Sequence, residues 1–442
     1  MTLNRINRVQ IAKPTPAASA WDNVEKYQSA DMVGGSYSDL EVTAATTLEH
    51  SRPQIETSGQ RGDGEMPARV VGNKDAAPSL AFYMRGLDLP GGAGAGVDAA
   101  TASPQYHLLL EQAAGGAVRN IEGEAVIAGS TRWVLQFGAG QVAAVGYAAG
   151  DVVGWVNASG KLECLPVVIA DAATDTITVA GDSVGGTGGF SAAPADTDVI
   201  YGMRTYSVDQ TAGEREHLAI NAQMADGAMT RIFQGCLGSL ALADDNGLLT
   251  GTWAGQAQNW EAAQNLAGAP AFGVFTAPVV GPVSTRGARV LIADGDSWGL
   301  SPVGYTQTAV AVATAIAAGF DLGVDVQPRT AATGTNGRQG FVAVEAACSS
   351  ELRLYHDGTT ADLLAGGSQT FGDGAALELM DGTVVSLLMQ FGDQPGATVV
   401  VEIPAYQADV SAGDEGGLAT IDLSGRGFRP AFGSATARIH LL

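Results

Sequence analysis

Charged side chains are scarce in this chain, and basic ones are the scarcest. Only 16% of the 442 residues are charged, and 23 Lys and Arg stand against 46 Asp and Glu, so the formal net charge is −23. Binding to nucleic-acid phosphates requires clustered Lys and Arg, so the composition argues against it, and equally against binding to an anionic membrane surface. An acidic surface serves solubility, or it lines a channel that DNA passes without adhering; the sign of the charge fits both.

Cysteines are few as well. Cys164, Cys236 and Cys348 lie far apart, and no CxxC pair occurs. A zinc site or a disulfide framework needs paired or closely spaced cysteines, so neither is predicted. Synthesis in a reducing compartment is the simple inference.

Motifs of catalytic and metal sites are missing too. The histidines are not spaced as HExxH or as paired ligands, and no Walker motif occurs. Asp294 and Asp296 begin like a calcium loop, but the remaining ligands and the closing Glu are missing. We therefore expect no enzyme activity, no catalytic residue, no cofactor and no metal. The histidines are His50, His107, His217, His356 and His440.

Long hydrophobic runs are also absent. The first residues, MTLNRINRVQIAKPTPAASAW, contain no apolar core of a secretory signal, so none is expected. The most apolar stretch, Ala309–Phe320, is short, and Val310 and Val312 alternate with smaller residues. This pattern predicts a strand and no membrane span.

Glycine, by contrast, is abundant, with 60 residues, and apolar residues alternate along many segments. Glycine weakens helix interiors and suits tight turns. In Ser79–Arg85 every second residue is apolar, and 176–179, 399–403 and 419–423 alternate in the same way. Such period-two patterns are typical of antiparallel sheets with one buried face. The sequence predicts a mainly β protein, and its length predicts two or three domains.

Two segments favour helices instead. Ser103 can cap a helix, Pro104 suits its first position, and apolar residues at helical spacing continue to Gly115. A shorter helix is predicted at Thr359–Gly367, where Asp362 completes the spacing of a capping box.

Strands and loops recur around these helices in the same order, which indicates an internal repeat. Each helix follows a strand, a Gly-rich loop and a second strand. Each half closes on a similar strand pair, because Ser239–Gln256 resembles Tyr406–Arg426. The matched first strands are Asp39–Leu48 and Thr306–Phe320, and the matched second strands are Ser79–Arg85 and Phe341–Ala347.

The spacing of matched glycines predicts an insertion in the first half. Gly115 matches Gly366 at an offset of 251, whereas Gly247 matches Gly417 at an offset of 170, which leaves about 81 additional residues. The segment Val118–Tyr201 has this size and alternates strands with turns, so we expect a small β-barrel-like domain there. A shared β composition that imitates a repeat is the alternative to a true duplication.

The expected organisation has five parts. They are an N-terminal arm at 1–35, a first module at 36–117 and 202–268, the inserted β domain at 118–201, an extended proline-rich connector at 269–282, and a second module at 283–442.

Several of these segments resemble the long tail tube proteins of tailed bacteriophages. They are DLEVTAATTLEHSRP with its basic Gly-rich loop and SLAFYMRG, then FQGCLGSLALADDNG, and then EIPAYQADVSAGDEGG followed by a strand. The resemblance runs from about residue 36 to the end. None of these motifs is a catalytic signature.

The resemblance implies two tail-tube-type β-sandwich modules, each with a flanking helix, whose sheets pair across subunits into a continuous inner barrel. Six modules form a ring, and rings stack into the conduit for DNA ejection. Two modules per chain would give trimeric rings with pseudo-sixfold symmetry, and one module would give hexameric rings. The implied partners are other copies of the chain and tail proteins such as the tail terminator and the distal tail protein. DNA would pass through the lumen without specific binding. The chain would be synthesised in the bacterial host cytoplasm and end in the virion, with no membrane contact.

Two Gly-rich loops, at 59–72 and 330–340, are long for hairpins. We expect them to contact the neighbouring ring, where their basic side chains would pair with carboxylates. Exposed pairs contribute only about 0–1 kcal/mol each, so they would set register more than affinity. Surface loops without a partner are the alternative. The basic residues are Arg61, Arg69, Lys74, Arg329 and Arg338.

Two other functions compete with the tube. A head decoration or tail-tip protein would form a small closed oligomer and no filament. The segment Val290–Leu300 runs into Gly-Asp-Ser, as in GDS-type esterases, and would make Ser297 a nucleophile. That chemistry needs an Asp-x-x-His base, and neither His356 nor His440 has an Asp three residues before it.

Overall fold

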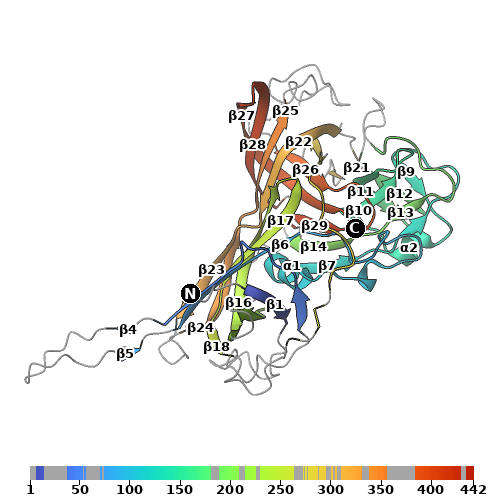
Figure 1. Cartoon of the computed structure of the whole chain (residues 1–442). Coiled ribbons are helices and arrows are strands. Elements are labelled where there is room, and N and C mark those ends of the chain that lie inside the picture. Colours follow the sequence, from blue (N-terminus) through green and yellow to red (C-terminus); the bar gives the residue numbers. More distant parts are fainter. Residues whose placement is uncertain are drawn as a thin grey trace, which may run out of the picture.

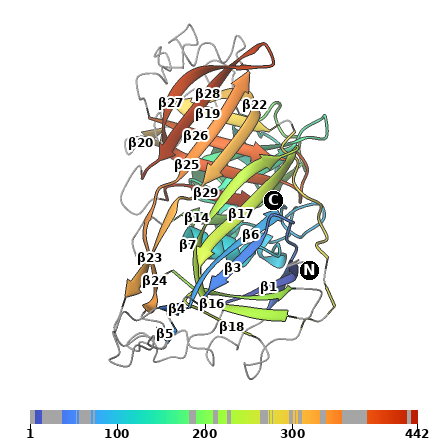
Figure 2. The same cartoon turned by 60° about the vertical axis from the view of Figure 1, so that its left-hand side comes forward.

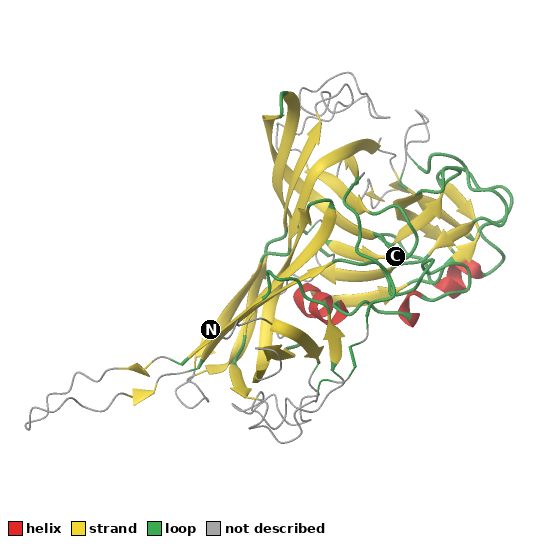
Figure 3. Ribbon diagram, in the orientation of Figure 1, coloured by secondary structure: helices red, strands yellow, loops and turns green. Residues whose placement is uncertain are grey.

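The computed structural model describes residues 6–13, 37–52, 54–55, 70–71, 74–180, 189–208, 215–224, 229–262, 272, 274–275, 277–286, 288–294, 300–301, 304–305, 310–330, 338–355, 384–429 and 435–442. Strands account for 59% of the described residues and helices for 5%, so the prediction of a mainly β protein is confirmed. Figure 3 shows how few helices flank the strands.

Hydrogen bonding links most strands into one large sheet (Figure 1). Its strands are β1 (Ile6–Ala12), β2 (Ser38–Leu40), β3 (Thr47–Ser51), β6 (Asp75–Tyr83), β7 (Gly115–Asn120), β14 (Arg204–Val208), β15 (Leu218–Met224), β16 (Met229–Asp245), β17 (Leu248–Gln256), β18 (Asn259–Ala262), β19 (Arg289–Asp294), β22 (Val310–Asp321), β25 (Ser349–Tyr355), β26 (Val384–Phe391), β27 (Val399–Glu415), β28 (Leu418–Gly427) and β29 (Arg438–Leu441).

The remaining elements are smaller. A six-stranded sheet contains β8 (Glu124–Ala125), β9 (Val134–Gln136), β10 (Val152–Val156), β11 (Leu162–Asp171), β12 (Thr176–Val179) and β13 (Val199–Tyr201). Two-stranded hairpins are formed by β4 (Gln54–Ile55) with β5 (Val70–Val71), β20 (Leu300–Ser301) with β21 (Gly304–Tyr305), and β23 (Val324–Thr330) with β24 (Arg338–Ala346). The helices are the 3₁₀ turn η2 (Ala99–Thr101), α1 (His107–Ala114) and α2 (Gln141–Val145).

Helix α1 starts later than the sequence predicts. It begins at His107, and the Ser103 hydroxyl makes no cap but pairs with the Arg204 guanidinium. Its end agrees with the prediction, because Gly115 has φ 71° and donates its N–H to the Glu111 carbonyl oxygen. The second predicted helix, at 359–367, lies outside the described residues.

The expected N-terminal arm at 1–35 contains a strand of the sheet instead. Strand β1 pairs on one side with β15 and on the other with β2. Val9 and Ile11 are buried, whereas Arg8 and Gln10 bind the carboxylate of Asp39. The apolar residues at 9 and 11 therefore belong to a strand. The segment is short and its neighbours are polar, so the sequence alone did not indicate one.

Two sets of four strands show the same pairing. The order β3–β6–β17–β16 in one set is repeated as β22–β25–β28–β27 in the other. Tyr83 pairs with Thr250 in the first set, and Tyr355 pairs with Thr420 in the second. The third and fourth strands therefore correspond at an offset of 170 (250 to 420), and the first two at 272 (83 to 355).

The irregularities of the two sets correspond as well. The register of β15 with β16 shifts between Leu218 and Ile220, and that of β26 with β27 shifts between Val385 and Leu387. Both hairpin turns have two central residues with positive φ, Asn246–Gly247 and Gly416–Gly417. Such turns match the twist of the flanking strands, which explains the glycines at these places.

One expected match is wrong in the structure. Ser79–Arg85 was matched to Phe341–Ala347, most of which lies in β24, but the pairing of β6 corresponds to that of β25. The hairpin β23–β24 is inserted between β22 and β25, as β4–β5 is inserted between β3 and β6. A repeat of alternating strands allows a match to slip by one strand, because successive strands share the same pattern.

The six-stranded sheet between β7 and β14 curls upon itself. Its order is β8-β13-β10-β11-β12-β9, and a bridge from Val126 to Phe137 joins its two ends. Its core also includes Leu291 and Leu388 from β19 and β26. Strand β19 is buried on both faces, since Val290 and Ile292 contribute to the large core on its other side. This explains its continuous apolar run.

Candidate functional site

The two sets of strands meet in one continuous sheet. Strand β16 pairs antiparallel with β22 through Ala241 with Asp321 and Leu242 with Phe320. The Leu322 N–H donates to the Leu240 carbonyl oxygen at 3.0 Å. The resulting order is β3-β6-β17-β16-β22-β25-β28-β27, which can be followed in Figure 2.

Both outer strands of this sheet offer an open edge. Within the described residues, β3 pairs only with β6, and β27 from Ala408 to Glu415 pairs only with β28. Leu48 of β3 is buried, whereas Ser411 and Ala412 of β27 are exposed. An open edge presents unpaired N–H and C=O groups that another strand can bind.

One face of the sheet is apolar and the other is acidic. Leu80, Trp253, Leu240 and Leu352 are buried on the apolar face. The positions between them carry charged, polar or small residues, as the strand pattern predicts. In the described part of the sheet, the acidic residues on this face are Glu49, Asp75, Asp245, Asp321, Glu351, Asp409, Glu415 and Asp422, and the basic ones are Arg353 and Arg426.

The positive charge of Arg353 is offset on this acidic face. Its guanidinium binds Asp422 at 2.8 Å and Glu415 at 2.8 Å. These carboxylates raise the pKa of Arg353, and the largest cause is the hydrogen bond that Arg353 donates to Asp422. The face therefore presents a net negative surface to the solvent.

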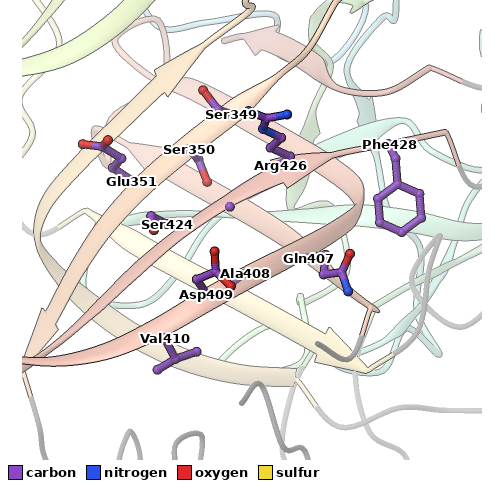
Figure 4. Close-up of a pocket in the computed structure, with 11 residues that line it drawn as sticks. Ser349, Ser350, Glu351, Gln407, Ala408, Asp409, Val410, Ser424, Arg426 and Phe428 are labelled. Carbon is purple, nitrogen blue, oxygen red and sulfur yellow. The ribbon is translucent and has the colours of Figure 1, made fainter. Parts of the chain in front are cut away.

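A hollow of about 660 Å³ lies beside the β27 edge. Glu351, Ser424 and Asp409, from β25, β28 and β27, lie across it in Figure 4. Arg426 and Phe428 line its other end. The hollow combines open backbone, carboxylates and an aromatic ring, so its chemistry suits a polypeptide segment better than an anion.

Helix α1 covers the apolar face of the first set. The Trp253 indole N–H donates to Gln112 Oε1 at 2.7 Å, and Gln112 Nε2 donates to the Gly238 carbonyl oxygen at 3.3 Å. The side chain of Gln112 is buried, so these bonds satisfy its amide. The helix is thereby held against β16 and β17.

The five basic residues predicted to contact the neighbouring ring lie in different parts of the chain. Arg61 and Arg69 lie outside the described residues. Lys74 pairs with Glu261 of its own chain and donates to the Trp260 carbonyl oxygen at 2.9 Å. Lys74 therefore joins the base of its hairpin to β18.

Arg329 and Arg338 lie near the far end of the β23–β24 hairpin, where Thr330 pairs with Arg338. Strands β23 and β24 lie at the same end of the molecule as β4 and β5, away from the β27–β28 turn (Figures 1 and 2). The two hairpins thus extend from corresponding places in the two strand sets.

The residues weighed for esterase chemistry do not form a site in the described structure. Ser297 and His356 lie outside the described residues. His440 is buried, with Nδ1 at 2.8 Å from Thr205 Oγ1 and Nε2 at 3.4 Å from Glu402 Oε2. Both ring nitrogens are engaged in the core, where a substrate does not reach.

Glu402 is the centre of this buried polar group. Burial alone raises the pKa of its carboxyl, but the Arg438 guanidinium at 2.9 Å and His440 more than offset burial, and the pKa falls to about 2. Strand β27 is thereby tied to β29. This ion pair has a structural role.

The remaining sequence candidates are also structural. The three cysteines are free and buried, and burial raises the pKa of each thiol. Trp253 is buried in the core, whereas Trp260 packs on His50 with ring centroids 4.5 Å apart. In the part of the chain that the structure describes, no group of His, Cys, Asp and Glu is arranged to hold a metal.

The sequence reasoning missed the acidic face and the two edges. Acidic residues at alternate positions, such as Asp409 and Asp422, signal a polar face, but only the pairing places them beside Glu351. The described helices are all too short or too polar to cross a membrane. Comparison with protein-family models finds no match for this chain, and comparison with curated proteins finds none either.

Proposed function

We propose that this chain is a structural subunit of a bacteriophage tail, which polymerises as stacked rings into the tail tube through which DNA is ejected. The supporting observation is the β16–β22 joint, which fuses two equivalent strand sets side by side into one sheet. The two strand sets are, on this proposal, the duplicated tube modules. A head-to-tail contact of this kind repeats until it closes, because each addition leaves one edge of each type open.

The ring contains three chains on this proposal. Each chain contributes two strand sets, and six sets correspond to the six modules that the resemblance implies. A continuous sheet that closes on itself removes both open edges, which is the physical advantage of a barrel over an open sheet. Stacked rings then form the tube, with the long hairpins β4–β5 and β23–β24 reaching toward the next ring.

The acidic face lines the lumen on this proposal. Carboxylates such as Glu351 and Asp409 repel the DNA phosphates, so the genome slides without adhering. The six-stranded domain packs on β19 and β26 and lies on the other side of the molecule from this sheet (Figure 1), so it faces outward. Because the six-stranded domain lies outside the tube on this proposal, it does not obstruct the lumen.

The proposed partners are other copies of the chain and, at the two ends of the tube, the tail terminator and the distal tail protein. The protein is synthesised in the host cytoplasm and becomes part of the virion. No observation favours the esterase, since His440 is buried and bonded through both ring nitrogens.

Negative-stain electron microscopy of the concentrated protein tests the proposal. We expect hollow tubes with a regular axial repeat, and rings with the mass of three chains. Discrete particles that never elongate would exclude the tube and favour a head decoration or tail-tip protein. Rings of six chains would retain the tube but contradict two modules per chain.

A further inference from the structure

The joint inside the chain provides a template for the joint between chains. The open edge of β27 corresponds to the part of β16 that pairs with β22, because β16 and β27 correspond at the offset of 170. The open edge of β3 corresponds to the paired end of β22 at the offset of 272, because Thr47 pairs with Ser79 as Gly319 pairs with Glu351. Each open edge is thus equivalent to an edge that is already paired.

These offsets transfer the register of the joint residue by residue. Ala241 and Leu242 of β16 correspond to Ser411 and Ala412 of β27 (241 to 411, 242 to 412). The paired residues of β22, at 321 and 320, correspond to 49 and 48 in β3.

We propose that β27 of one copy pairs antiparallel with β3 of the next, with Ser411 opposite Glu49 and Ala412 opposite Leu48. This register rests on the proposed ring and names the contact that closes it. The partner is a second copy of this chain.

The burial of the two edges supports this register. Leu242 and Phe320, which face each other across the internal joint, are each 2% exposed. Ala412, at the place of Leu242, is exposed in the single chain. Pairing with β3 would bury it beside Leu48, as the internal joint buries Leu242.

The charges along the two edges are also compatible. Glu49 carries the carboxylate of the β3 edge, and it meets the small neutral Ser411 in this register, so like charges do not face each other. Two residues along, Asp409 lies opposite Ser51 in this register, which is again a small neutral residue.

A disulfide between the two edges tests the register. Directly opposed residues of antiparallel strands have Cα atoms about 4.5–5.5 Å apart, which is within the range of a disulfide. The double variant Glu49→Cys/Ser411→Cys places one thiol on each edge. Six strands separate the two positions within one chain, so a disulfide must join different chains. The native cysteines are buried, which keeps the background low.

We expect oxidation with copper phenanthroline to convert most of the double variant into a covalent ladder on a non-reducing gel, which ends at the ring size. The matched control is Thr252→Cys/Ser411→Cys, because Thr252 is also exposed on the same face but lies on the inner strand β17. This control should remain monomeric on the gel. If Glu49→Cys/Ser411→Cys does not fold, Ser51→Cys/Asp409→Cys tests the same register two residues along.

The outcomes for the register and for the tube differ. If the protein forms tubes but neither folded double-cysteine variant gives a ladder, the register is wrong and the tube proposal stands. A ladder from small closed particles that never elongate would support the register and overturn the tube. A ladder of equal yield in the Thr252 control would also overturn the register, because it would show non-specific collision.

Discussion

Asp244 and Asp414 lie 170 residues apart and make the same hydrogen bond. Each accepts, through Oδ1, the backbone N–H of the glycine three residues later, at 3.2 Å from Gly247 and 3.1 Å from Gly417. Each carboxylate therefore closes a tight turn at the end of a long hairpin, where the strands project into solvent. The two strand sets share this local chemistry as well as their pairing.

The turn glycines should be needed for their positive φ. Gly417 has φ 88° and no atom within 4 Å of a Cβ built on it, so Gly417→Ala adds left-handed strain without a clash. We expect the free energy of unfolding to fall by about 1 kcal/mol in urea titrations. Gly416→Asn is the matched control, because Asn246 occupies the equivalent place with φ 56°. A larger loss in the control than in Gly417→Ala would contradict this account.

Gln112 should be important for the stability of the α1 side of the core. Gln112→Ala leaves the Trp253 indole N–H and the Gly238 carbonyl oxygen without their partner. An unsatisfied buried polar group costs about 1–3 kcal/mol, so we expect a loss of that size in chemical unfolding. Glu111→Ala, on the same helix, removes only a partly exposed pair with Lys13 and should change stability by less than about 1 kcal/mol.

The Glu402 carboxyl predicts a loss of stability in acid. Its pKa is about 2 in the folded chain, below its ordinary value of 4.5. A carboxyl whose pKa is lowered by folding stabilises the fold at pH values above its ordinary pKa. This contribution disappears as the pH falls from 4.5 toward 2. This contribution to the free energy of unfolding is on the order of 3 kcal/mol, because one pKa unit corresponds to about 1.4 kcal/mol.

Urea unfolding between pH 7 and pH 2.5 measures this effect. Glu402→Gln should be less stable at pH 7 and should lose the part of the pH dependence that lies below 4.5. Glu351→Gln is the control, because Glu351 is exposed on the acidic face. Identical pH profiles for the original chain and Glu402→Gln would show that the carboxylate does not stabilise the fold in this way.

The acidic face should keep DNA from adhering to the tube. We expect tubes of Glu351→Lys/Asp409→Lys to retain DNA at low salt and to release it as salt rises, because phosphate contacts release counterions. Infectivity of phage carrying this variant should fall, since the genome would be held during ejection. Asp171→Lys/Asp196→Lys places the same charges on the outward domain and should leave delivery unchanged. Equal DNA delivery by both variants would show that this face does not line the lumen.

A charge exchange should reveal the contact between copies. Ser411→Glu places a carboxylate opposite Glu49 of the next copy and should slow assembly, measured by light scattering at low salt. The double variant Glu49→Lys/Ser411→Glu restores opposite charges and should recover the rate. If the double variant assembles as slowly as the single one, these two residues do not face each other between copies.

Local features were readable from the sequence because they depend on near neighbours. The period-two runs predict the mainly β class, and Gly115 ends α1 as predicted. The match of Gly247 with Gly417 at 170 agrees with the register of the two hairpins. Each of these depends on a few adjacent residues, whose backbone preferences act without the rest of the chain.

Other expectations went wrong where distant segments decide the outcome. Ile6–Ala12 was assigned to an arm, but β15 and β2 supply its partners from far along the chain. Ser103 was expected to cap α1, but Arg204 takes its hydroxyl. Each competing partner lies at least 27 residues away in sequence, the separation of Ile11 and Ser38.

The sequence by itself determined the class of structure, the acidic balance, and the positions of the turns in the closing hairpins. Only the tertiary structure decided which strands became neighbours, which face gathered the carboxylates, and which edges stayed open. The physical reason is that alternation assigns a side chain to one of two faces but carries no information about the strand beside it. The β16–β22 pairing supplies that information, and from it follow the acidic surface and the edges at Glu49 and Ser411.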